Sequence, residues 1–92
     1  AGDVLHFVSD PRVRGGNVTV ELRADVAGTA HLFLWKDGGT LAYETVELSP
    51  GRTKRIQLSP DGGSPDGSTV LAAFETDDGA ATVRSANVAA DD

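Results

Sequence analysis

Few side chains in this sequence are of a type that could carry out chemistry, and their spacing matches no catalytic motif. The chain has two histidines, His6 and His31, and no cysteine. A zinc site takes three or four ligands, so carboxylates from other segments would have to join both imidazoles. Five of the six serines fall in or beside a predicted loop or strand end, and none of the six lies in a nucleophile-elbow motif. We therefore expect no enzymatic activity, no metal site and no cofactor.

Aspartates in predicted turns and loops are the remaining candidates for metal ligands; they are Asp61, Asp66, Asp77 and Asp78. Oxygen-rich loops bind calcium, although the ligand spacing of an EF-hand is missing here. Adjacent acidic residues in a hairpin turn more commonly shape the turn and stay in contact with water. Calcium binding is therefore kept as an alternative to a purely structural role.

The tripeptide Asn17-Val18-Thr19 has the pattern of an N-glycosylation site. It stands at the start of a predicted strand, directly after Gly15-Gly16, where exposure to solvent is expected. If the protein is exported, Asn17 is a candidate for glycosylation. Otherwise the tripeptide is a chance match to a short motif.

Composition and charge limit the partners of this chain. The formal net charge of −6 disfavours nucleic acid and anionic membrane surfaces. No apolar run approaches the ~18 residues of a membrane span, so we expect no direct membrane insertion. Asp outnumbers Glu, and Arg outnumbers Lys. This composition resembles that of halophilic archaea, whose acidic surfaces stay hydrated in high salt; an ordinary acidic protein from a bacterium with a GC-rich genome is the alternative.

Alternation of apolar and polar residues dominates the chain, and turn residues interrupt it about every 8–12 residues. No segment has the period of a helix. Predicted strands cover residues 4–8, 17–24, 29–36, 40–48, 52–58, 68–76 and 81–89. Seven short strands without helices predict one domain over residues 1–92. Its expected fold is a seven-stranded immunoglobulin-like Greek-key sandwich, with a small barrel as the nearest alternative.

Three segments carry a resemblance to a known kind of module: residues 29–39, 46–53 and 65–73. They hold a strand with an Asp-Gly hairpin, a turn of the form Leu-x-Pro-Gly, and a late strand, and so resemble CARDB-type and fibronectin-III-type modules. Thr69 and Val70 stand where such modules usually have a corner tyrosine. The resemblance implies a sandwich domain of an extracellular or cell-surface protein, serving as a spacer, adhesion unit or partner-binding domain without catalysis.

The segment from Thr29 to Lys36 is apolar on both faces, which is unusual for a strand of a two-sheet sandwich. With a three-residue turn over residues 37–39, Trp35 would face Leu41 and Phe33 would face Tyr43. Phe33, Trp35, Leu41 and Tyr43 would then share one face, opposite the aliphatic Ala30, Leu32 and Leu34. If the aliphatic face lines the core, the aromatic face is left outside as a partner-binding surface. The alternative is that the aromatic side chains form the core or are covered by another segment.

These observations predict a non-catalytic extracellular module that acts structurally or by interaction. It would be a domain of a surface protein, or a subunit of a filament or virus particle, with a protein partner or a second copy on the aromatic face. A carbohydrate- or ligand-binding module that uses the same face is the alternative.

Overall fold

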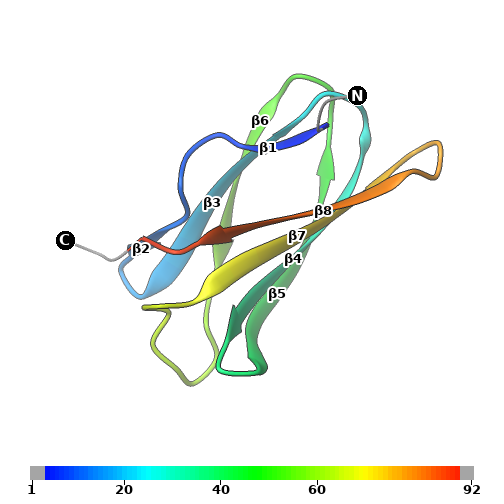
Figure 1. The fold of residues 1–92 in the computed structure, drawn as a ribbon. Coiled ribbons are helices and arrows are strands. Elements are labelled where there is room, and N and C mark those ends of the chain that lie inside the picture. Colours follow the sequence, from blue (N-terminus) through cyan, green and yellow to red (C-terminus); the bar gives the residue numbers. More distant parts are fainter. Residues whose placement is uncertain (1–3, 90–92) are drawn as a thin grey trace.

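Eight strands in two antiparallel sheets make up the computed structural model, which describes residues 4–89 (Figure 1). The strands are β1 (Leu5–Phe7), β2 (Arg12–Arg14), β3 (Asn17–Ala24), β4 (Gly28–Lys36), β5 (Gly39–Leu48), β6 (Thr53–Leu58), β7 (Thr69–Thr76) and β8 (Ala81–Asn87). Each sheet has four strands, and the two lie face to face in a sandwich-like arrangement. This confirms the all-β prediction. Residues 4–89 contain no helix, and so none that is long and apolar enough to cross a membrane.

The first sheet is centred on β3, which pairs with β6 along one side. Two short strands follow each other along its other side: β1 places Leu5 opposite Ala24, and β2 places Arg14 opposite Asn17. The sequence predicted seven strands and no strand between residues 8 and 17. That part of the prediction is wrong, because a strand of three residues is too short for an alternating pattern to be recognised.

The second sheet has the strand order β5-β4-β7-β8, so that β4 and β7 are its central strands. Gly28, the first residue of β4, leaves no room for a side chain between these two strands. A Cβ atom at this position would lie 2.4 Å from the carbonyl oxygen of Glu75 and 2.7 Å from Cζ of Phe74. The start of β4 therefore requires a residue without a side chain.

The core lies between the two sheets and is built from alternate residues of their strands. Its buried hydrophobic side chains are Leu5, Val13, Val18, Val20, Leu22, Ala24, Ala30, Leu32, Leu34, Leu48, Ile56, Leu58, Val70, Ala72, Phe74 and Val88. Ser68 is the one buried polar residue within residues 4–89, and its hydroxyl donates to the carbonyl oxygen of Pro65. Because the core uses one face of each strand, the other faces of both sheets remain as surface.

Candidate functional site

The outward face of β4 carries the aromatic side chains. Leu32 and Leu34 are fully buried in the core, so strand alternation turns His31, Phe33 and Trp35 to the outside of the sheet. Trp35 is 43% exposed, and Tyr43 on the neighbouring β5 is 51% exposed. Of the two arrangements that the sequence left open, the structure has the aliphatic face in the core and the aromatic face outside.

Phe33 and Tyr43 form a cross-strand pair at the middle of the β4–β5 hairpin. They are opposite each other in register, as predicted. Their ring centroids are 4.9 Å apart, and the ring planes are inclined by 46°. Tilted pairs at this separation are favourable because the positive edge of one ring approaches the negative face of the other.

A chain of hydrogen bonds holds the hydroxyl group of Tyr43 in place. The Thr45 hydroxyl donates to the Tyr43 hydroxyl over 2.8 Å, and the Tyr43 oxygen lies 2.9 Å from Nδ1 of His31. Because Thr45 supplies one proton, the phenol proton is available to Nδ1 in the tautomer that is protonated at Nε2. His31 also stacks on Tyr43, with ring planes 17° apart. The ring of Tyr43 is thus oriented by Phe33, His31 and Thr45 together.

Leu41 does not share the face of Trp35, and this part of the prediction is wrong. The turn has two residues, Asp37 and Gly38, whose φ angles of 52° and 81° are those of a type I′ turn. Lys36 therefore pairs with Gly39, and Trp35 pairs with Thr40 instead of Leu41. The pairing shifts at this point, so that Leu41 is the extra residue of a β-bulge and packs against the core.

The aromatic side chains continue into a larger apolar surface on β7 and β8. Leu71 lies opposite Phe33, and Ala73 lies opposite His31. Val83 of β8 is paired with Ala73 and is 67% exposed. We call this region the aromatic surface and define it by His31, Phe33, Trp35, Tyr43, Leu71 and Val83.

A shallow hollow of about 250 Å³ indents the aromatic surface over β7, between its neighbours β4 and β8, with His31, Ala73 and Val83 in its lining. Leu71 and Val83 were not among the candidate residues chosen from the sequence. The alternation of Val70, Ala72 and Phe74 was the available signal, because burial of those residues sends Leu71 and Ala73 outwards.

The residues considered for metal binding do not come together. His6 lies in the first sheet, with Nε2 3.1 Å from Oδ2 of Asp25, whereas His31 lies in the second. Asp61 is beside the turn end of the β4–β5 hairpin, where its amide donates to the Leu41 carbonyl, whereas Asp77 bonds to Ala27 at the opposite end of β4. Within residues 4–89, no three His, Asp or Glu side chains are grouped to hold a metal ion. The four candidate aspartates therefore form no common calcium site.

Asp78 instead shapes the β7–β8 turn. The Thr76 hydroxyl donates to the Asp78 carboxylate, and the backbone amide of Ala80 donates to Thr76 Oγ1 over 2.9 Å. The hydrogen bond from Thr76, followed by one from the backbone of Ala80, lowers the pKa of Asp78 below its ordinary value of 3.8. This is the behaviour of an acidic side chain that organises a turn.

Asn17 begins β3, where it pairs with Arg14 across the turn formed by Gly15 and Gly16. Both glycines have positive φ angles, as tight hairpin turns require. Asn17 is partly exposed at this end of the first sheet. Its glycosylation stays a prediction.

The structure thus offers an open aromatic sheet face as the main candidate for function. Its geometry is that of a surface for contact and not of an enclosed pocket. Neither a protein-family model nor a curated protein sequence matches this chain, so its function is inferred from the geometry of its own surfaces.

Proposed function

We propose that this domain is a non-catalytic extracellular interaction module that binds a protein partner or a second copy through the aromatic surface. One observation carries the proposal: Trp35, Tyr43 and Val83 are exposed on the same sheet face as Phe33. Soluble monomers rarely leave large contiguous apolar patches uncovered. Trp and Tyr are also the residues that contribute most strongly to binding at protein interfaces.

The strand order supports an immunoglobulin-like Greek-key topology for this module. β1 and β2 occupy one position beside β3, so the eight strands fill seven positions. One sheet then consists of β1 with β2, of β3 and of β6. The other consists of β4, β7 and β8, with β5 at its edge. Together with the resemblance to CARDB-type and fibronectin-III-type modules, this favours a cell-surface domain or a subunit of a filament or virus particle. The acidic composition favours a halophilic archaeon as its source.

Carbohydrate binding is the second candidate, because aromatic rings beside polar groups suit sugar rings. The polar atoms on this surface are, however, largely engaged with one another: Tyr43 bonds to both His31 and Thr45. A sugar would have to break these bonds to obtain directional contacts. A protein side chain that packs on the rings would leave them intact, which is why we place the protein partner first.

The test replaces Trp35 by serine and measures association. We expect the unchanged chain to assemble as its concentration rises, most clearly in molar salt, which screens the repulsion between copies of net charge −6. Trp35→Ser should keep a cooperative unfolding transition and lose this assembly. Size-exclusion chromatography with light scattering measures the mass, and thermal unfolding measures the cooperativity.

Val8→Ser is the matched control, since Val8 is 46% exposed but follows β1 in the first sheet. It should assemble like the unchanged protein. A chain that is monomeric at every concentration and salt would contradict self-association. A monomer that is stabilised by one glycan or by calcium would favour the ligand-binding alternative.

A further inference from the structure

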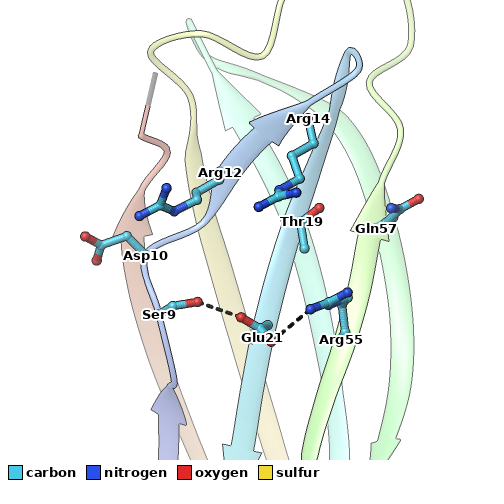
Figure 2. Close-up of a pocket in the computed structure, with 8 residues that line it drawn as sticks. All are labelled: Ser9, Asp10, Arg12, Arg14, Thr19, Glu21, Arg55 and Gln57. Atoms are coloured by element: carbon cyan, nitrogen blue, oxygen red, sulfur yellow. Dashed lines mark hydrogen bonds and ion pairs between the residues drawn. The ribbon is translucent and has the colours of Figure 1, made fainter. Parts of the chain in front are cut away.

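A second hollow lies on the outward face of the other sheet and differs in character from the aromatic surface. Its volume is about 350 Å³, and every residue that lines it is polar or charged: Ser9, Asp10, Arg12, Arg14, Thr19, Glu21, Arg55 and Gln57 (Figure 2). We call it the arginine hollow. The side chains come from the segment after β1 and from β2, β3 and β6.

Strand register brings these residues together from distant parts of the chain. Thr19 of β3 lies opposite Arg12 on one side and opposite Gln57 on the other. Glu21 lies opposite Arg55 in the same way. Val13 is buried in the core, so the alternation of β2 directs its two arginines outwards.

The arginine hollow has an excess of positive charge in an otherwise acidic protein. It contains three of the eight Lys and Arg residues of the chain, against two carboxylates, Asp10 and Glu21. Local cationic groups raise the concentration of anions at such a place even when the net charge of the protein is −6.

The pairing within the hollow leaves two arginines available. Arg55 Nη2 lies 3.7 Å from Glu21 Oε2, and the Ser9 hydroxyl donates to Glu21 Oε1 over 2.9 Å; both contacts are drawn in Figure 2. Glu21 is therefore engaged from both sides. Within residues 4–89, Arg12 and Arg14 have neither an ion pair nor a side-chain hydrogen bond.

Thr19 supplies an independent indication of a ligand. Its hydroxyl oxygen is buried and has no hydrogen-bond partner among residues 4–89. A buried hydroxyl without a partner is destabilising, so native structures rarely contain one that nothing satisfies. Thr19 itself lines the hollow, and its strand β3 runs between the strands of Arg12 and Gln57. Rotation of the Thr19 side chain about χ1 would turn this hydroxyl towards an acceptor oxygen placed in the hollow.

We propose that the arginine hollow binds a tetrahedral oxyanion, either a phosphate or a sulfate group. The guanidinium groups of Arg12 and Arg14 donate charge-assisted hydrogen bonds to its oxygens, and the Thr19 hydroxyl, turned towards the hollow, donates to one of them. The volume of the hollow exceeds that of a single ion, so the group is either accompanied by water or belongs to a larger molecule.

Titration of the ¹⁵N-labelled protein with inorganic sulfate and with inorganic phosphate tests this proposal. Ionic strength is held constant with sodium chloride, so that general screening does not change. With at least one of the two anions, we expect saturable shifts of the backbone amide signals of Arg12, Arg14 and Thr19. The Nε signals of the two arginines should shift in the same way. The anion that binds more tightly shows whether the hollow prefers a phosphate or a sulfate group. An absence of saturable shifts with both anions would overturn the proposal.

Arg12→Gln and Arg14→Gln should each weaken binding by about three- to tenfold, since each removes one charged donor. Arg23→Gln is the matched control, because Arg23 is an exposed arginine of β3 that does not line the hollow. It should bind like the unchanged protein. An equal loss in Arg23→Gln would show that the anion senses only the overall charge and would contradict a defined site.

Thr19→Val removes the hydroxyl but keeps the shape of the side chain, so it tests the contribution of the hydroxyl alone. In buffer without either oxyanion, this variant should unfold at the same temperature as the unchanged protein or higher, because it removes an unsatisfied buried hydroxyl. Its affinity for the anion should fall. Unchanged affinity would overturn the assignment of Thr19 to the site. Trp35→Ser should bind the anion normally, so failure of the arginine hollow and failure of the aromatic surface are distinguishable.

Discussion

Tyr43 shows how neighbouring side chains fix the orientation of a ring on the aromatic surface. Its ring is held by Phe33 on one side, and its hydroxyl is held by Thr45 and His31. A side chain that is already oriented loses less conformational freedom when a partner arrives, so more of the contact energy remains as affinity. The tilted ring pair should therefore contribute to both stability and binding.

A double-mutant cycle on Phe33→Ala and Tyr43→Ala measures this contribution. We expect a coupling free energy of about 0.5–1 kcal/mol in urea unfolding, since partly exposed aromatic pairs lie at the lower end of the usual range. In a cycle with Tyr43→Phe, which keeps the ring and removes the hydroxyl, most of the coupling to Phe33 should be absent because the ring contact is unchanged. A coupling near zero in the alanine cycle would mean that the rings are neighbours without attraction.

Asp78 is a second residue whose neighbours determine its behaviour, in this case its pKa. The hydrogen bonds from Thr76 and Ala80 favour the carboxylate, so its pKa is lower in the folded chain than the ordinary value of 3.8. The charged form therefore stabilises the β7–β8 turn above about pH 4, and this contribution is lost as the pH falls through the folded-state pKa.

Thr76→Val should raise the pKa of Asp78 towards its ordinary value, because it removes the largest cause of the shift. Carboxyl ¹³C titration by NMR measures the change directly. Thr76→Ser retains a hydroxyl and should keep the lowered pKa. If Thr76→Val leaves the titration of Asp78 unchanged, the hydrogen bond from Thr76 is not its cause.

Among the secondary-structure elements, β4 imposes the strictest requirements. It pairs with β5 on one side and with β7 on the other, and it supplies both the core and the aromatic surface. Its first residue, Gly28, lies against the backbone of Glu75 and the ring of the buried Phe74. These neighbours are a carbonyl oxygen and a packed ring, neither of which moves easily.

Gly28→Ala should therefore destabilise the protein by about 1–3 kcal/mol, the usual cost of forcing an extra group into a packed site. Gly39→Ala is the control: it begins β5, and its added Cβ would have only the Lys36 carbonyl oxygen in reach, at 3.9 Å. Surface substitutions of this kind usually change stability by less than about 0.5 kcal/mol. Urea unfolding compares the two variants, and equal effects would contradict the close approach at Gly28.

At the scale of the whole molecule, the two sheets present different outer faces. The outer face of the β5-β4-β7-β8 sheet carries the aromatic surface, whereas the outward face of β2, β3 and β6 carries the arginine hollow. The core separates the two faces. The proposed protein partner and the proposed oxyanion would therefore not compete for the same surface, and we expect variants of one surface to leave binding at the other unchanged.

Much of the fold was determined by local patterns in the sequence. The alternation in residues 17–24 predicted the bounds of β3, and the turn residues predicted the hairpins β4–β5 and β7–β8. Such features depend on the period of two and on turn chemistry, which neighbouring residues specify. The opposition of Phe33 and Tyr43 was predicted correctly but for the wrong reason: the prediction assumed a three-residue turn, whereas a two-residue turn followed by the bulge at Leu41 produces the same pairing.

Other features were decided only by tertiary structure. Both faces of β4 are apolar, so its sequence alone could not say which face meets the core; the packing of the two sheets turned Leu32 and Leu34 inwards and left Trp35 outside. The bulge at Leu41 places this side chain in contact with the core, so its position likewise depends on packing between the sheets. The arginine hollow needed the pairing of β2 and β6 with β3, which joins Arg12 to residues more than forty positions away. Contacts between distant segments depend on the free energy of the whole core, and no local pattern records them.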